Sequence, residues 1–143
     1  MNVGSICSRR PVTVSTGAAL SEVARLMRDE HVGAVVVTRG AEHPRVAGII
    51  TDRDIVRAQL EKTADLSRLS AEETMTPNPL VIAADEPLDG AISHLRARGV
   101  RRAPVVAADG SLAGVVSADD LLAQLAVELI GVAGIVAQQS RRT

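Results

Sequence analysis

An internal repeat constrains this chain more than any other feature, because it divides 143 residues into two copies of one small unit. The segment Pro11-Val12-Thr13-Val14 matches Pro79-Leu80-Val81-Ile82 at an offset of 68 residues. The offset shortens to 66 where Gly48-Ile49-Ile50-Thr51 matches Gly114-Val115-Val116-Ser117. Both missing residues fall in one loop, which spans 39–45 in the first copy and 107–111 in the second. We therefore predict two structurally equivalent units.

Each unit has the sequence pattern β-α-β-β-α. A short apolar strand, at 12–14 and again at 80–82, precedes four apolar residues with the i, i+3, i+4, i+7 spacing of a helix. These residues are Leu20, Val23, Ala24 and Met27 in the first unit and Leu88, Ala91, Ile92 and Leu95 in the second. Two β-rich runs joined by a turn follow, and a second helix begins at Asp52 and at Ala118.

Neither half is large enough to bury a generous core alone, so we expect the two to pack together. The predicted fold class is α/β (α+β), with two β-α-β-β-α repeats packed by their sheets into one pseudo-twofold module. The repeat divides the chain into a first unit at 1–62, a linker at 63–70, a second unit at 71–139 and a tail at 140–143.

The last helix is predicted to run from Ala118 to about Gln139, beyond the length of its counterpart in the first unit. Gly131 and Gly134 would weaken a helix but would let another backbone approach closely, which makes this helix a candidate dimer contact. A break in the helix near Gly131 is the alternative.

Composition narrows the classes of partner. The formal net charge is -1 and Phe, Tyr and Trp are absent, so neither a basic surface nor an aromatic platform favours nucleic-acid binding. Cys7 is the only cysteine, which indicates a reducing compartment, and the N-terminus lacks the pattern of a signal peptide. The stretch Leu121 to Ala137 carries Gln124 and Glu128 and is a little short for a bilayer span. We expect a cytoplasmic protein without a membrane partner.

The start of the second helix in each unit has the residues that an anion site needs. A glycine and two aliphatic residues lead to Thr51, with Asp54 three residues later, and the same pattern leads to Ser117 and Asp120. A hydroxyl and free backbone N–H groups at a helix start suit a phosphate. A carboxylate one turn later can accept hydrogen bonds from ribose hydroxyls.

The same residues have a purely structural interpretation. Thr-x-x-Asp and Ser-x-x-Asp are close to the capping box, in which both side chains bind the N–H groups of their own helix. The duplication after an identical strand pattern favours a ligand, because a cap does not require that strand.

These motifs resemble those of a tandem pair of CBS domains, also called a Bateman module. The resemblance rests on both Gly-aliphatic-aliphatic-Thr/Ser-x-x-Asp copies, on Val100-Arg101-Arg102-Ala103-Pro104-Val105 before the second hairpin, and on the openings Ile6-Cys7-Ser8 and Thr74-Met75-Thr76-Pro77. It extends from about Val3 to Leu125, and Cys7 replaces the usual methionine.

The resemblance implies a disc-like module with two clefts that bind adenosine-containing ligands such as AMP, ADP or ATP. By position, Thr51 and Ser117 would lie near the phosphate, and Asp54 and Asp120 would hold the ribose. Arg101 and Arg102 match phosphate-contacting positions, although Arg101 is also placed to pair with a neighbouring carboxylate. The base would be lined by residues around Thr13, Val35, Val81 and Ala103. The first unit has Gly33-Ala34 in place of the arginine pair, so the clefts should be unequal.

No residue pattern supports catalysis. The three histidines lack metal-ligand spacing, no nucleophile elbow or Gly-rich phosphate loop is present, and the pairs Asp52/Asp54 and Asp119/Asp120 are not equivalent between the units. We expect a free-standing, non-catalytic sensor that needs no cofactor, forms a homodimer and regulates a separate protein. The alternatives are a structural dimerisation module without a ligand, and a site for S-adenosylmethionine or a dinucleotide.

Overall fold

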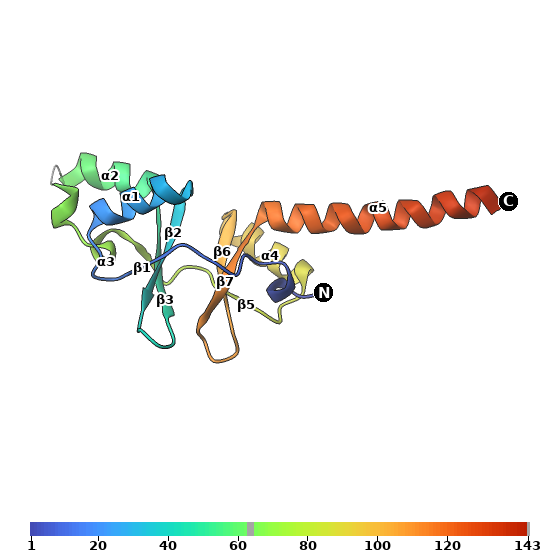
Figure 1. Ribbon diagram of the computed structural model, residues 1–143, viewed down its shortest axis with the longest axis horizontal. Coiled ribbons are helices and arrows are strands. Elements are labelled where there is room, and N and C mark those ends of the chain that lie inside the picture. Colours follow the sequence, from blue (N-terminus) through green and yellow to red (C-terminus); the bar gives the residue numbers. More distant parts are fainter. Residues whose placement is uncertain (63–64, 143) are drawn as a thin grey trace.

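The computed structural model describes residues 1–62 and 65–142 and arranges them as two lobes side by side, with one long helix projecting from the second lobe (Figure 1). Residues 63 and 64 of the predicted linker and residue 143 of the predicted tail lie outside the described residues. Each lobe contains its own sheet and its own buried core. The predicted fold class is confirmed.

The first lobe is a four-stranded sheet covered by two helices. Its strands are β1 (Thr13–Ser15), β2 (Ala34–Arg39), β3 (Arg45–Thr51) and β4 (Thr76–Pro77), hydrogen-bonded in the order β1-β2-β3-β4. The helices are α1 (Leu20–Glu30) and α2 (Asp52–Lys62). The residues spaced for a helix in α1 supply Leu20, Val23 and Met27 to the core, where they pack with alternating residues of β2 and β3.

The second lobe repeats this arrangement. Its strands β5 (Ile82–Ala83), β6 (Arg102–Val106) and β7 (Leu112–Ser117) form a three-stranded sheet, and its helices are α4 (Leu88–Arg98) and α5 (Ala118–Arg142). The first pair of strands is parallel and the second antiparallel in both lobes. The register shifts after Val37 in β2 and after Val105 in β6, which are equivalent positions of the repeat. The internal repeat is therefore a structural repeat.

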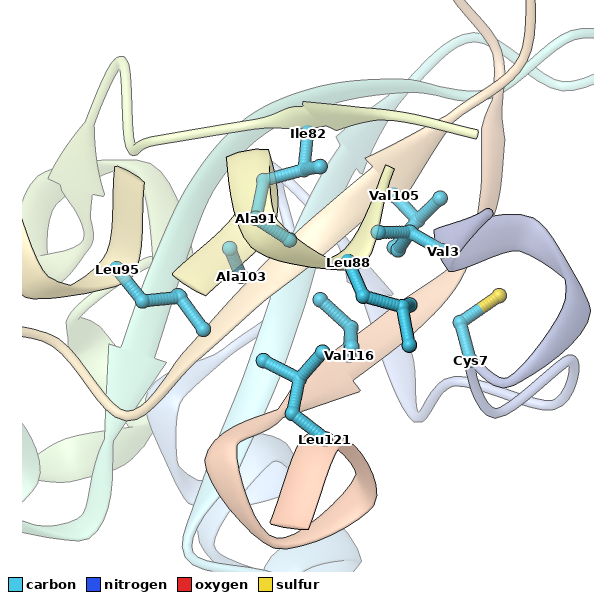
Figure 2. Close-up of a cluster of buried hydrophobic side chains, with 10 residues drawn as sticks. All are labelled: Val3, Cys7, Ile82, Leu88, Ala91, Leu95, Ala103, Val105, Val116 and Leu121. Carbon is cyan, nitrogen blue, oxygen red and sulfur yellow. The ribbon is translucent and has the colours of Figure 1, made fainter. Parts of the chain in front are cut away.

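The segment that leads into each unit packs on the opposite lobe. The 3-10 helix η1 (Val3–Ser5) and the residues after it place Val3 and Cys7 in the core of the second lobe, beside Leu88 and Val105 (Figure 2). The equivalent segment, with the 3-10 helix η2 (Leu66–Arg68) and α3 (Ala71–Thr74), places Leu69 and Ala71 in the core of the first lobe. The two lobes therefore exchange their leading segments, and residues 65–70 of the predicted linker take part in this exchange.

A glycine in β3 and its equivalent in β7 let these leading segments cross the sheets. β4 pairs with β3 at Gly48, and Ser8 forms a β-bridge with Val115 beside Gly114. A Cβ atom at Gly114 would collide with the Ser8 carbonyl oxygen, and one at Gly48 would lie 2.7 Å from the Thr76 carbonyl oxygen. Only glycine allows the backbones to approach this closely. The glycine of the repeated motif therefore has a packing role.

The helix α5 continues through Gly131 and Gly134 to Arg142, so the alternative of a break near Gly131 is wrong. Leu121 is its only buried residue within the described part of the chain, and every residue from Leu125 to Arg142 is exposed. Among the described helices, α5 is the one that is long and apolar enough to cross a membrane by length and composition alone. The helix is therefore longer than the stretch Leu121 to Ala137, whose shortness was one reason to expect no membrane span.

Candidate functional site

Two clefts lie where the lobes meet, and each combines the helix start of one unit with the leading strand and a loop of the other. We call the larger one, of about 690 Å³, cleft A; it brings Thr51 and Asp54 together with Pro79, Leu80 and residues 98–102. Cleft B has a volume of about 220 Å³ and brings Ser117 and Asp120 together with residues 10–12, Val32 and residues 34–36. Protein sites for small ligands usually measure about 300–1,000 Å³. Cleft A is large enough for a nucleotide, whereas cleft B is small.

Both helix starts form capping boxes. The Thr51 N–H donates to Asp54 Oδ2 at 2.8 Å, and the Asp54 N–H donates to Thr51 Oγ1 at 3.2 Å. In the second unit the Ser117 N–H donates to Asp120 Oδ2 at 2.9 Å, and the Asp120 N–H donates to Ser117 Oγ at 3.1 Å. The structural interpretation of these motifs is therefore correct for both copies.

A capping box leaves capacity for a ligand. Each carboxylate uses Oδ2 for the cap, which leaves Oδ1 as an acceptor, and each hydroxyl retains its own proton as a donor. Asp54 Oδ1 lies 3.9 Å from the guanidinium of Arg57, one turn along α2, and the Asp54 side chain is 17% exposed. The cap fixes the carboxylate at the cleft wall, so capping and ligand binding are compatible at one residue.

The two predicted arginines differ in position. Arg101 lines cleft A and also forms an ion pair with Asp119 at 3.5 Å, which confirms the expected pairing with a neighbouring carboxylate. Both of these side chains are largely exposed, so the pair is weak. Arg102 lines both clefts, as do Ala34 and Ile49. The clefts therefore meet at Arg102, which begins β6.

The predicted base-lining residues are only partly at the clefts. Val35 lines cleft B, whereas Thr13, Val81 and Ala103 lie outside the linings of both clefts. Ala103 is fully buried in the second core, because its side chain points to the opposite face of β6 from that of Arg102. Thr13 and Val81 are exposed, and their neighbours Val12 and Leu80 reach the clefts instead.

Several lining residues are absent from the sequence prediction. They are Arg10, Pro11 and Val12 in cleft B, and Arg53, Pro79, Leu80 and Arg98 in cleft A. The pairs Pro11-Val12 and Pro79-Leu80 open the two matching segments of the repeat, so the repeat itself contains a signal for them. Arg53 lies inside the Thr51-x-x-Asp54 motif, whereas Arg10 and Arg98 have no such signal, because their place at the clefts depends on how the lobes pack.

The charges of the clefts are unequal, as the arginine pair predicts. Cleft A has four arginines, at 53, 98, 101 and 102, with Asp52 and Asp54. Cleft B has Arg10 and Arg102 with Asp120. Near cleft B, burial raises the pKa of the Cys7 thiol, partly opposed by Arg9 and reinforced by Asp120. Across residues 1–62 and 65–142, no three His, Cys, Asp or Glu side chains gather in a way that could hold a metal ion.

Comparisons with known proteins agree with this geometry. Residues 3–61 and 71–127 each match the CBS domain. The chain is 29% identical over 122 residues to an uncharacterized protein of Methanopyrus kandleri, covering 85% of this chain and 61% of that protein. It is 30% identical over 119 residues to an uncharacterized 17.7 kDa protein of Acidianus ambivalens, covering 83% of this chain and 70% of that protein. It also matches a homoserine O-acetyltransferase of Methanohalophilus mahii, of which it spans only 24%.

Solved structures share the fold. The CBS domain pair of protein MJ0100, in complex with 5′-methylthioadenosine and S-adenosyl-L-methionine, superposes with a TM-score of 0.73 at 26% identity, covering 87% of this chain and 99% of that one. The protein CBSX2 in complex with AMP superposes with a TM-score of 0.74 at 24% identity, covering 90% and 97% of the two chains.

Proposed function

Because this chain belongs to the CBS domain family, with one domain in each half of the repeat, we propose that it is a non-catalytic regulatory module that binds AMP, ADP or ATP in cleft A. The observation that carries the proposal is the concentration of four arginines in a cleft of about 690 Å³, with Arg53 in the capped helix start and Arg98, Arg101 and Arg102 opposite it. Arginine guanidinium groups bind phosphate oxygens through two parallel N–H groups, so this wall suits a polyphosphate.

The remaining walls suit a nucleoside. Leu80, Pro79 and Ile49 provide aliphatic surface between which a base can lie, in a chain that has no aromatic side chain. Asp54 offers Oδ1 to the ribose hydroxyls while Oδ2 remains in the cap. We assign Thr51, Asp54, Arg101 and Arg102 to the nucleotide, and Ser117, Asp120 and Val35 to the smaller cleft B.

Regulation follows from the position of the cleft. Residues of both lobes line cleft A, so a bound nucleotide would connect them and favour the lobe packing that closes on it. A ligand shifts such an equilibrium by its difference in affinity for the two arrangements. A separate protein that recognises one arrangement would respond to the nucleotide. We propose that this regulation takes place in the cytoplasm and that the chain acts as a homodimer.

Calorimetric titration with AMP, ADP and ATP tests the proposal. We expect one site per chain in cleft A, weakened by Asp54→Ala, while the matched cap variant Asp120→Ala leaves affinity unchanged. Because the chain lacks Phe, Tyr and Trp, a nucleotide retained during purification would dominate the ultraviolet spectrum. No binding at millimolar concentration, with the chain folded, would contradict the proposal.

A second candidate ligand is S-adenosylmethionine, favoured by the ligands of the MJ0100 domain pair. It has one carboxylate and no phosphate, and its sulfur is a cation, so the arginines of cleft A would contribute less to its binding than to that of ATP. Titration with this ligand therefore separates the candidates, because removal of Arg101 and Arg102 should weaken ATP binding far more than S-adenosylmethionine binding. A structural module without a ligand is the remaining alternative; its capping boxes would serve only their own helices.

A further inference from the structure

The projecting part of α5 has a regular apolar face that nothing in the described chain covers (Figure 1). Successive spacings of 3, 4, 3 and 4 residues place five large apolar side chains along one side of the helix. We call this row the α5 seam; it consists of Leu122, Leu125, Leu129, Val132 and Val136. All five side chains are exposed. This is the a and d spacing by which two helices pack along their length.

The charges along α5 specify an orientation for a partner helix. Asp119, Asp120 and Glu128 lie in its first half, and Arg141 and Arg142 end it. Two parallel copies would place like charges side by side at both ends, whereas two antiparallel copies place the arginines of one at the level of the aspartates of the other. The macrodipoles of antiparallel helices are also opposed. Charge complementarity thus favours a second copy of this chain, in the antiparallel orientation.

We propose that α5 forms an antiparallel helix pair with α5 of a second copy through the α5 seam. In the register that overlaps the helices most fully, Leu125 packs against the partner copy's Val136, and Leu129 against the partner copy's Val132. Each helix has 25 residues, about 37 Å, so the pair extends away from both clefts. This proposal is independent of the nucleotide.

The seam goes beyond what the family match explains. The second CBS domain match ends at residue 127, so the distal half of the seam lies outside it. A membrane is the competing occupant, because α5 is long and apolar enough to cross one. The uninterrupted apolar run from Leu129 to Ala137 covers only about 14 Å, against a hydrocarbon core of about 30 Å. Glu128 would have to enter that core, which disfavours the membrane.

Neighbouring residues provide a matched pair of variants. Leu129 lies in the seam and is 70% exposed, whereas Ile130 lies beside it, off the seam, and is 71% exposed. Light scattering coupled to size-exclusion chromatography, from about 5 to 200 µM, measures the mass of each species. We expect a dimer for the native chain and for Ile130→Glu, and a monomer for Leu129→Glu. Circular dichroism confirms that both variants remain folded.

Crosslinking tests the orientation. In a Cys7→Ser background, Leu125→Cys and Val136→Cys are made separately. Antiparallel pairing predicts that neither variant forms a disulfide with itself, and that a mixture of the two forms a mixed disulfide. Self-crosslinked Leu125→Cys would overturn the antiparallel orientation.

Two results would overturn the pairing itself. One is a monomeric native chain over the full concentration range. The other is equal loss of self-association in the two glutamate variants, accompanied by equal loss of flotation with anionic vesicles of phosphatidylcholine and phosphatidylserine. That second result would identify the membrane as the occupant of the α5 apolar surface.

Discussion

Clefts A and B begin from the same local structure and end as different sites. Both have a capping box at the helix start, with N–H to carboxylate distances of 2.8 and 2.9 Å. They differ in the loop that faces this start, which is supplied by the other unit. Cleft A faces Gly99-Val100-Arg101-Arg102, whereas cleft B faces only the uncharged Val32 and Ala34 of the equivalent loop. The duplicated motif thus forms the same cap in both clefts, and the opposite loop gives the two clefts different charges.

The largest expected effect comes from making the loop of cleft A resemble that of cleft B. The double variant Arg101→Gly, Arg102→Ala removes the two groups that we propose bind phosphate, and a hydrogen bond to a charged group is worth about 1.5–3 kcal/mol. We expect ATP affinity to fall by about 100-fold or more in calorimetric titration. The control variant Arg25→Ala, Arg28→Ala removes two arginines of α1 that line neither cleft, and it should bind ATP normally. Unchanged affinity in the first variant would place the phosphates elsewhere.

Gly48 and Gly114, where the leading segments cross the sheets, should both contribute to the free energy of unfolding, but unequally. A Cβ at Gly114 meets the Ser8 carbonyl and the Cys7 sulfur, whereas one at Gly48 meets the flexible side chain of Met75 as well as backbone. We expect Gly114→Ala to lower the free energy of unfolding by about 2–3 kcal/mol, and Gly48→Ala by about 1–2 kcal/mol. Chemical denaturation measures both values. Gly17→Ala, with open space around its Cβ, serves as the control.

Variants of the two capping aspartates distinguish an effect on stability from an effect on nucleotide binding. Asp54→Ala and Asp120→Ala each lose a cap, so both should reduce the free energy of unfolding by about 1 kcal/mol. Only Asp54→Ala should also reduce nucleotide affinity, by about tenfold. Parallel denaturation and titration measure the two effects. If both variants lost affinity equally, cleft B would also hold a nucleotide.

The smallest expected effect concerns the residue that ends the first helix of each unit. His31 has a φ of 54° and Gly99 a φ of 65°, so both occupy the left-handed region at equivalent positions. Glycine adopts this conformation without strain, whereas histidine does not. We expect His31→Gly to raise the free energy of unfolding by about 0.5–1 kcal/mol, and Gly99→Ala to lower it by a similar amount. A destabilised His31→Gly variant would show that the imidazole makes a compensating contact.

The repeat makes much of this fold predictable, because equal spacing of apolar residues produces equal elements. It predicts the β-α-β-β-α order within each unit, although not α3 or β4, and it identifies Thr51, Asp54, Ser117 and Asp120 as paired positions. It does not predict that Val3 packs in the second lobe, since periodicity identifies an apolar face without identifying the core that receives it.

The residues that line the clefts could likewise be predicted only in part from the sequence. Thr13 and Val81 are adjacent to the lining residues Val12 and Leu80, and alternation along an extended chain sends neighbours to opposite faces. Arg10 and Arg98 line a cleft whose helix start belongs to the other unit, so they reach it through the packing of one lobe on the other. Such contacts depend on three-dimensional arrangement, which the spacing of one sequence does not contain.

The exchange of leading segments affects how the chain can fold during synthesis. Val3 is synthesised about a hundred residues before Val105 and Val116, which share its core. The first half therefore cannot fold completely before the second half is made, because Val3 and Cys7 pack in a core that includes β7. Contacts so distant in sequence slow folding. The second lobe can therefore close its core only after synthesis reaches β7, when the segment at Val3 joins the sheet of β5, β6 and β7.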